Sequence, residues 1–520
     1  MFSRFRTPLF FVLIAVWFVV FQPWGSFTDP DAFYHAKVTS LMLAHGPLIA
    51  LPWLDLTSLG AHFADQHFLF HFLMLPFVRV FEMLPGAQIS TIFFAVCFSL
   101  VLFLSLRRLR VPYVKLWTLL ALASPSLFMR LSLGKASPLA LSWFVLGVTA
   151  LVTRSPWLAF FTGAGFALTH GGWLILLGCQ GLMLVGEILH DRVISDYSWR
   201  DAFRMMSWKT FFSSLAGMVL GFCLHPNAKQ LPAFLWVQVV QVGFLARIDQ
   251  LRLGSEWYPP TVSEVVASFS LLLMVALALC FGFLFARRVA GSVMRTKQVI
   301  ALALPAAVIF ALVFKSRRFI EYAIPLFVMW LAVLSTFVDR SRFRSEVILL
   351  WQERTARLKQ GSRQLLMVLL ISFLVFILGR QQMTVYNALN SRNTAFQYWS
   401  ALVAVLRQHV PAGGRVYHVF WDEFPALFAT ADEYRYISGL DPTFLLAASS
   451  TLSDAYGSVA FRSVTSTDPY AVIVDQFHAD AVLIDKRRRA ELDVVLQSDA
   501  RFTRIYDSAE QSLYVLEKSR

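Results

Sequence analysis

Apolar stretches of membrane-spanning length recur throughout the first 380 residues of the chain. A helix needs about 20 apolar residues to cross a bilayer core, and several of these stretches are near the short limit. Together they predict eleven transmembrane helices, at residues 9–21, 88–106, 112–129, 137–153, 156–170, 173–189, 210–225, 263–286, 298–314, 319–338 and 365–379.

Basic residues are concentrated in every second connection between these predicted helices. Cytoplasmic loops of membrane proteins are enriched in Lys and Arg, so these connections and the N-terminus, with Arg4 and Arg6, are predicted to be cytoplasmic. The clusters are Arg107, Arg108 and Arg110; Arg154; Arg192, Arg200, Arg204 and Lys209; Arg287, Arg288, Arg295 and Lys297; and Arg340, Arg342, Arg344, Arg354, Arg357, Lys359 and Arg363.

Two apolar segments admit more than one interpretation. The run 9–21 resembles a signal peptide, but the Pro-Trp-Gly-Ser that follows lacks a small-x-small cleavage site, which favours a retained anchor. Residues 65–82 are apolar enough to cross, yet a crossing there would move every later basic connection to the outer face. They are predicted to form a helix at the outer interface, rich in Phe, with His on its polar side.

The pattern changes after residue 380. Residues 381–520 are mixed polar, with strand-like runs at 416–420, 481–484 and 512–516 between helical stretches. The predicted fold is an α-helical polytopic membrane domain (1–380), whose outer loop 26–87 lies outside the cytoplasm, followed by an extracytoplasmic α/β domain (381–520).

Composition agrees with a membrane protein. Hydrophobic residues make up 57% and charged residues 15% of the chain, which excludes a soluble globular protein and a disordered one. The net charge of +14 is explained by the basic cytoplasmic loops and not by nucleic acid, and membrane lipids are expected as partners. All four cysteines lie in apolar runs, so neither disulfides nor a cysteine metal site is expected.

Acids and histidines gather in the predicted outer loop 26–87. Asp29 and Asp31 are two residues apart, a pattern suited to metal binding or general base work, although a solvated loop with a Pro turn is an equal alternative. Asp65, His67 and His71 follow on one face of the interfacial helix. They are candidates for metal or substrate binding, and the alternative is that they are simply hydrated.

Basic residues also occur on the predicted outer side, where exported loops avoid them. Anionic phosphate at the membrane surface would explain the exceptions, and lipid head-group anchoring is the alternative. These residues are Arg130, Lys135, Lys315, Arg317 and Arg318, and His170 lies at another outer helix end. The outer loop 246–262 adds Glu256, beside Trp257, and Glu264 follows at the start of the next helix, where it is either functional or a favourable helix-end charge.

These motifs together resemble the GT-C superfamily of membrane glycosyltransferases, and most closely the catalytic subunit of oligosaccharyltransferase. Asp31-Ala-Phe-Tyr-His35 matches the acidic motif in the first outer loop of that family, and Asp29 supplies a paired acid. Phe420-Trp421-Asp422 is similar to the Trp-Trp-Asp motif, and Thr261-Val-Ser-Glu264 to a late outer-loop motif. Two departures stand out: Lys135 occupies the region of the second acidic motif, and Phe420 replaces the first Trp.

The resemblance implies an inverting glycosyltransferase in the bacterial inner membrane. A sugar or oligosaccharide would move from a polyprenyl phosphate or diphosphate to an acceptor at the outer face. Asp31 would deprotonate or orient the acceptor, and Lys315, Arg317 and Arg318 would stabilise the leaving group. Asp29, Glu256 and Glu264 are further catalytic candidates, and Trp421 and Asp422 are candidates for substrate binding. The family's metal would be Mg or Mn on Asp29 and Asp31, with Lys135 doing part of its work.

Two alternatives remain at the level of sequence. The first is a GT-C transferase that glycosylates a lipid or polysaccharide instead of protein. The second is a transporter or assembly protein with an outer sensor domain, although transporters place their charged groups near the bilayer midplane.

Overall fold

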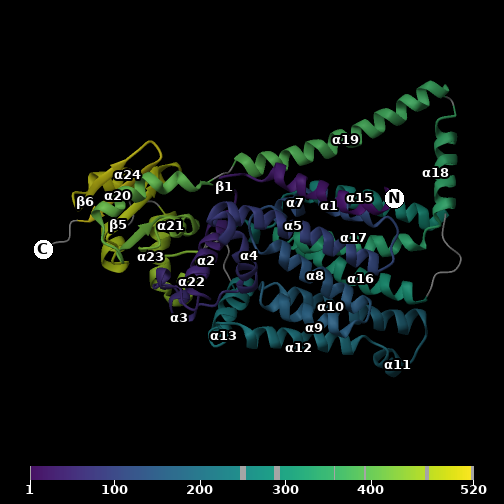
Figure 1. The fold of residues 1–520 in the computed structure, drawn as a ribbon, viewed down its shortest axis with the longest axis horizontal. Helices are drawn as coiled ribbons and strands as arrows, with labels where there is room; N and C mark the ends of the chain where they lie inside the picture. The colour runs from purple at the N-terminus through teal and green to yellow at the C-terminus, as the bar shows by residue number, and fades with distance from the viewer. Residues whose placement is uncertain are drawn as a thin grey trace.

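The computed structural model describes residues 2–245, 253–285, 293–356, 358–391, 394–462 and 468–516. A long helical bundle occupies most of the molecule, and a smaller α/β unit sits at one end of it (Figure 1). The N-terminus lies at the opposite end of the bundle from the α/β unit. Arg287, Arg288 and Arg357 of the basic clusters lie outside the described residues.

Helices stand at all eleven predicted transmembrane positions. Within the described residues, six helices are long and apolar enough to span a bilayer on their own. The fold is therefore that of a helical polytopic membrane protein. The helices are α1 (Phe2–Phe21), α5 (Met83–Arg108), α6 (Val114–Leu122) with α7 (Pro125–Leu131), α8 (Ser137–Val152), α9 (Pro156–Ala167), α10 (Trp173–Leu189), α12 (Trp208–Leu224), α15 (Val262–Phe285), α16 (Val293–Val313), α17 (Ile320–Leu334) and α19 (Gln360–Ser391).

The segment predicted as one span at 112–129 is instead two helices bent by 82°. The bend falls at Ala123 and Ser124, directly before Pro125, which occupies the first turn of α7. Proline lacks a backbone N–H and restricts the residue before it, so it starts a helix more readily than it continues one. After the bend, α7 runs near the α/β end of the bundle (Figure 1), and Arg130 lies in its last turn.

The connection between α1 and α5 folds into a compact helical layer. It contains α2 (Asp31–His45), η1 (Pro52–Leu54), α3 (Ser58–His62) and α4 (Phe68–Phe81). The predicted interfacial helix 65–82 is α4, but its histidine is not hydrated: His71 is fully buried, beside Phe70, Met74 and Val78, because α2 and α5 pack against that face.

The C-terminal α/β unit contains a five-stranded sheet with strand order β4-β3-β5-β7-β6. β3 is parallel to β4 and β5, whereas β7 is antiparallel to β5 and β6. The strands are β3 (Arg415–His418), β4 (Arg435–Tyr436), β5 (Ala481–Asp485), β6 (Phe502–Asp507) and β7 (Gln511–Leu516), and the helices include α20 (Ser400–His409), α21 (Phe424–Thr430), α22 (Thr443–Ala448), α23 (Ser450–Phe461) and α24 (Lys486–Ser498).

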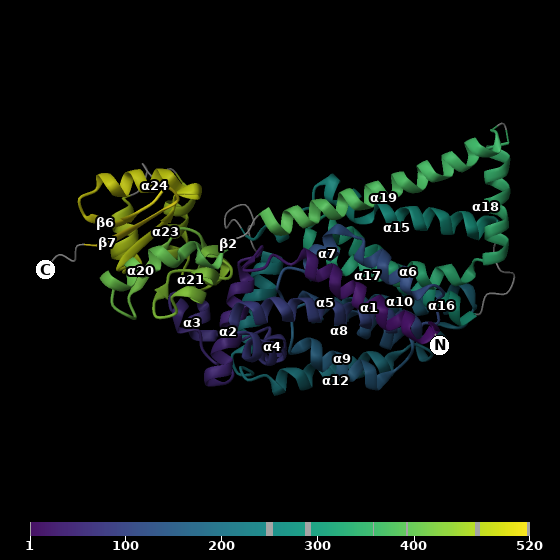
Figure 2. The same ribbon diagram turned by 45° about the horizontal axis from the view of Figure 1, so that its top comes forward.

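The α/β unit is attached firmly to the layer between α1 and α5. Strand β1 (Ser26–Phe27) pairs with β2 (Thr394–Ala395), and α2 packs against α21 (Figure 2). Asp55 forms ion pairs with two arginines of the α/β unit: its Oδ2 lies 2.8 Å from the Arg415 guanidinium and 3.2 Å from that of Arg435. One hydrophobic core contains residues of both parts, so the α/β unit covers the end of the bundle as a roof.

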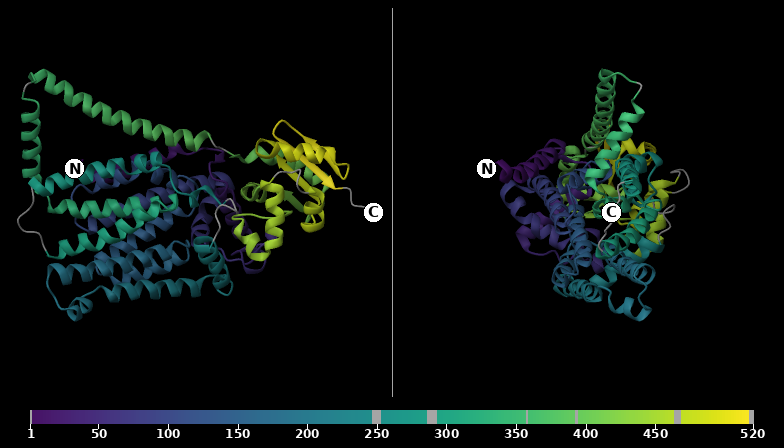
Figure 3. Two further views of the ribbon diagram at one scale, coloured as in Figure 1. Left: turned by 180° about the vertical axis from the view of Figure 1, so that it is seen from behind. Right: turned by 90° about the vertical axis from the view of Figure 1, so that its right-hand side faces the viewer.

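Helix α19 leans away from the bundle and meets it only near its C-terminal end (Figure 3). Its apolar window has no buried residue, so it presents apolar side chains all round. Helix α18 (Arg340–Arg354) joins it to the bundle at the end far from the α/β unit.

Candidate functional site

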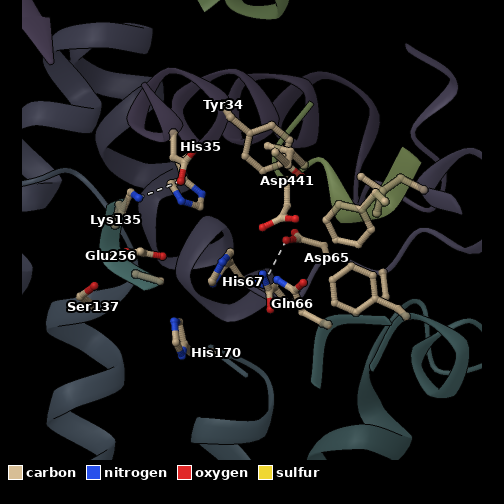
Figure 4. Close-up of a pocket in the computed structure, with 18 of the residues that line it drawn as sticks. Tyr34, His35, Asp65, Gln66, His67, Lys135, Ser137, His170, Glu256 and Asp441 are labelled. Carbon is tan, nitrogen blue, oxygen red and sulfur yellow. Dashed lines mark hydrogen bonds and ion pairs between the residues drawn. The ribbon is translucent and has the colours of Figure 1, made fainter. Parts of the chain in front are cut away.

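A cavity of about 110 Å³ lies beneath the α/β unit, at the end of the bundle (Figure 4). This volume holds several water molecules. Its walls come from elements far apart in sequence, and most of the side chains are polar. The polar and amphipathic side chains are Asp31, Tyr34 and His35 of α2, then Asp65, Gln66, His67, Arg130, Lys135, Ser137, His170, Gln238, Glu256, Trp257, Arg318 and, from the α/β unit, Asp441. The apolar lining residues are Leu59, Phe63, Ala64, Ala136 and Phe234, with Leu440 and Phe444 from the α/β unit.

Lys135 bridges the two acids of the first motif. Its Nζ lies 2.8 Å from Oδ2 of Asp29 and 2.8 Å from Oδ2 of Asp31. Asp31 opens α2, where a carboxylate is favoured by the helix dipole, and its backbone N–H donates to Asp29 Oδ1. Burial would lower the pKa of Lys135, but the two carboxylates raise it well above its ordinary value, so the ammonium stays charged.

The loop before α8 brings Lys135 to α2 through a glycine. Gly134 has a φ of +72°, in the left-handed region that favours glycine. A Cβ at this position would lie only 2.9 Å from the Cβ of Ala32. The loop can therefore pass this close to α2 only with glycine at position 134. Because the loop passes there, Lys135 lies between the two carboxylates.

A bound Mg or Mn ion does not fit the acidic pair as it stands. Carboxylate oxygens are the ligands that these ions prefer, but both acids already contact the Lys135 ammonium. Within the described residues, no group of three or more His, Cys, Asp and Glu side chains has the arrangement of a metal site. His71 has both ring nitrogens engaged, with Asp65 and His35.

Two arginines and two glutamates form a second charged cluster. Arg130 donates to Glu321 at 2.6 Å and to Glu256 at 2.8 Å, and Arg318 lies 3.4 Å from Glu256. The guanidinium of Arg318 also stacks on the Trp257 ring at 4.7 Å. Burial would raise the pKa of Glu256, but Arg318 and Arg130 hold it well below its usual range.

Two hydrogen bonds to backbone carbonyls hold Glu256 beside Arg318. The turn that carries Glu256, η4 (Ser255–Trp257), faces η5 (Arg317–Phe319). Ser316 Oγ donates to the Glu256 carbonyl, and the Arg317 N–H donates to the Tyr258 carbonyl. The Glu256 carboxylate therefore occupies a position where a phosphate oxygen would also meet two arginines.

Four histidines line or adjoin the cavity on its other side. His71 contacts Asp65 and His35 at 2.7 Å each, and His67 lies against His35 and His170. Burial is the main cause that lowers the pKa of His67 to about 4, and it also lowers the pKa of His35 and His170 well below their usual value. The imidazole rings of His67, His35 and His170 are therefore neutral at physiological pH.

Asp441 reaches the cavity from the α/β unit and has no motif in the sequence to reveal it. It follows Leu440, whose φ of 63° is unusual for a residue with a branched side chain, and Figure 4 shows its carboxylate pointing into the cavity. One oxygen, Oδ1, accepts the Thr443 N–H at 2.8 Å. Burial raises the pKa of Asp441 to about 6.

Several candidates from the sequence lie outside the cavity wall. Glu264 and Thr261 form a capping box at the start of α15, with bonds of 2.7 Å and 3.2 Å. Arg317 turns outward to within 3.5 Å of Glu264, and Lys315 is exposed. Asp422 forms a bidentate pair with Arg488, and the Trp421 ring lies near Gly254, the residue that precedes the turn carrying Glu256.

Comparison with known proteins yields matches by structure alone. No family model and no curated protein matches the sequence. The oligosaccharyltransferase of Archaeoglobus fulgidus in the apo form aligns at a TM-score of 0.63 and 11% identity, over 100% of this chain and 75% of that one. The same organism's oligosaccharyltransferase AglB, in complex with an inhibitory peptide and a dolichol-phosphate, aligns at 0.58 and 11%, over 100% and 75%.

ArnT from Cupriavidus metallidurans bound to undecaprenyl phosphate aligns at a TM-score of 0.60 and 14% identity, over 98% of both chains. The predicted resemblance is thereby confirmed at the level of the fold, which is of the GT-C, oligosaccharyltransferase-like type.

Proposed function

We propose that the protein is an inverting glycosyltransferase that uses a polyprenyl phosphate-linked or diphosphate-linked sugar. The observation that carries the proposal is that an acid-lysine pair and an arginine pair line the same cavity, under the α/β unit of a GT-C fold. Solved proteins of this fold include one bound to undecaprenyl phosphate and one bound to a dolichol-phosphate.

The arginine pair suits the leaving group. When the bond between the anomeric carbon and the phosphate oxygen breaks, negative charge grows on the phosphate, and guanidinium groups in fixed positions stabilise it. Arg318 and Arg130 are held by Glu256 and Trp257 before the donor arrives. The donor phosphate would take the place of the Glu256 carboxylate between them.

The acceptor would approach from the other wall. Asp31 lies there with Lys135, and Asp441 projects from the roof. Attack on the face of the sugar opposite the phosphate inverts the anomeric centre, and Asp31 orients the nucleophile and favours the positive charge that develops on the ring. Lys135 holds the two acids in the way that a divalent cation would.

A lipid or glycan acceptor is the second candidate, and the position of Trp421-Asp422 favours it. Asp422 pairs with Arg488 of the same α/β unit and does not line the cavity. The acidic group that does reach the cavity from this unit is Asp441, which suits a hydroxyl or amino group of any acceptor.

The proposal places the cavity at the outer face of the bacterial inner membrane. The N-terminus and α18, with its basic residues, lie at the end of the bundle opposite the α/β unit. Reporter fusions at Arg340 and at Gly414 are therefore expected to report opposite sides of the membrane. The same side for both would contradict this orientation.

Transfer with purified protein tests the activity directly. The protein in lipid nanodiscs is incubated with radiolabelled hexoses on undecaprenyl phosphate and diphosphate. Each donor is offered an Asn-x-Thr peptide, a bacterial lipid extract and a bacterial polysaccharide. Labelled product with one acceptor class is expected, and its anomeric configuration should be inverted. A protein that binds the lipids and transfers no sugar to any acceptor would favour the transporter or assembly alternative.

Lys135→Ala tests whether the Lys135 ammonium, which lies between Asp29 and Asp31, takes the place of a divalent metal ion. It leaves two acids without a partner, so transfer is expected to fall about 100-fold, the scale of removing one stabilising group. Added Mg²⁺ or Mn²⁺ should restore part of it, because the carboxylate oxygens become available as ligands. The wild type should be insensitive to EDTA. A wild type inactivated by EDTA would contradict the assignment of Lys135.

A further inference from the structure

We propose that His35 removes the proton from the attacking acceptor, and that His71 and Asp65 form a relay that stabilises the charge it gains. This inference rests on the proposed function and assigns a catalytic residue to it. The three side chains form a continuous chain of contacts from the cavity wall into the protein interior.

The geometry of the chain is that of consecutive hydrogen bonds. Asp65 Oδ2 lies 2.7 Å from His71 Nδ1, and His71 Nε2 lies 2.7 Å from His35 Nδ1. Asp65, His71 and His35 are 2%, 0% and 4% exposed, so water does not compete for these contacts. Asp65 Oδ1 accepts the backbone N–H of His67, which fixes the carboxylate.

One arrangement of protons satisfies every contact when Asp65 is ionised and His71 is neutral. An ionised carboxylate only accepts, so the neutral His71 carries its single ring proton on Nδ1 and accepts at Nε2. His35 must then donate from Nδ1, and the lone pair of its Nε2 is the acceptor at the end of the chain. His35 lines the cavity, and Figure 4 shows its ring pointing toward the middle of it.

The electrostatic surroundings keep His35 neutral before reaction. Burial, then His71, His67, Lys135 and His170, lower its pKa well below the ordinary value. The groups that face it are Asp31 and Tyr34 on its own helix, His67 and His71 on α4 with Asp65 before it, Lys135 before α8 and His170 before α10. Asp65 lies at the far end of the chain, where it stabilises a proton taken up at His35.

Asp31 is less suited to this step because its carboxylate shares the Lys135 ammonium with Asp29. A carboxylate in that position orients and stabilises charge, whereas a neutral imidazole with a free lone pair accepts a proton. Asp31 and His35 are four residues apart on α2, so both face the same region of the cavity.

The proposed step balances in atoms and charge. The acceptor's oxygen or nitrogen forms a bond to the anomeric carbon, and the bond from that carbon to the phosphate oxygen breaks with its electron pair. The acceptor's proton moves to Nε2 of His35. The Nδ1 proton of His35 can then shift to His71, and that of His71 toward Asp65, before the proton returns to water.

The test compares His35→Gln with His45→Gln, an identical substitution at the exposed end of the same helix. With radiolabelled hexoses on undecaprenyl phosphate, His35→Gln is expected to slow transfer by about 100-fold or more, the usual scale of general base catalysis. His45→Gln should match the wild type. Native mass spectrometry should show equal retention of undecaprenyl phosphate by both variants.

Two further measurements separate catalysis from folding. His35→Ala should regain activity when imidazole is added, which a purely structural role does not permit. Asp65→Asn should move the acidic limb of the kcat/KM profile to lower pH and lower its plateau, because loss of the carboxylate makes the protonated histidine less stable.

The relay is wrong if His35→Gln transfers sugar at the rate of His45→Gln, or if Asp65→Asn leaves the acidic limb in place and imidazole does not rescue His35→Ala. A wild type that transfers sugar from none of the donors would overturn the proposed function instead. The two failures are therefore distinguished by the activity of the wild type.

Discussion

Asp31→Asn is expected to reduce sugar transfer by about 1,000-fold while the protein remains folded, within the range measured for loss of a group that acts on the transition state. The substitution keeps the shape of the side chain and removes its charge. The amide would lose the ion pair with Lys135, which lies 2.8 Å from the carboxylate, and would no longer favour positive charge on the sugar ring. The measurement is the rate of transfer by the purified protein under saturating donor.

Asp196→Asn is the matched control for this substitution. Asp196 lies in the connection between α10 and α12, and its side chain is 94% exposed. Asparagine tolerates the φ of 53° found there, so the control should be as stable and as active as the wild type. An Asp31→Asn protein with near-normal transfer would show that the acidic motif of α2 does not carry the chemistry.

Arg318→Ala is expected to weaken donor binding and to slow transfer by about 100-fold to 1,000-fold, the cost of losing one charge-stabilising donor in an active site. The same contact strengthens as the phosphate leaves, so kcat and KM should both change. Arg318→Lys should recover only part of the loss, because an ammonium cannot make paired contacts to phosphate or stack as a planar group on Trp257. The donor-concentration dependence of transfer measures both effects.

Arg317→Ala is the control that the structure provides for this variant. Arg317 is the neighbour in sequence, yet it points away from the cavity toward Glu264, at 3.5 Å, and a partly exposed pair of this kind contributes little. Transfer should stay close to the wild-type rate. If Arg318→Ala behaves like Arg317→Ala, the basic cluster anchors lipid head groups and the phosphate assignment is wrong.

Local sequence patterns determined the architecture of this protein. The apolar runs predict the helices because every backbone polar group inside a bilayer must bond within its own segment. The change of pattern after residue 380 predicts the α/β unit, and strands lie at the three strand-like runs. The acidic motif with Asp31 and His35, and the basic residues Arg130, Lys135 and Arg318, likewise identified residues of both cavity walls from residue type alone.

The same patterns were least informative where the chain changes direction. The apolar run at 112–129 is continuous in sequence, but Pro125 divides it into two helices at 82°. Hydropathy averages over a window and does not register one missing backbone N–H, so the bend that directs Arg130 to the cavity was not expected.

Tertiary structure decided which candidates act together. Arg317 and Arg318 are equally basic, and only the turn at Ser316 places one inside the cavity and the other outside. His71 was expected to be hydrated and is buried because α2 covers α4. Asp441 joins the site from a position several hundred residues along the chain, through the docking of the α/β unit on the bundle. Residue type and helical periodicity are local properties, whereas the direction of a side chain into a shared cavity depends on how distant elements pack, and packing is set by the whole chain.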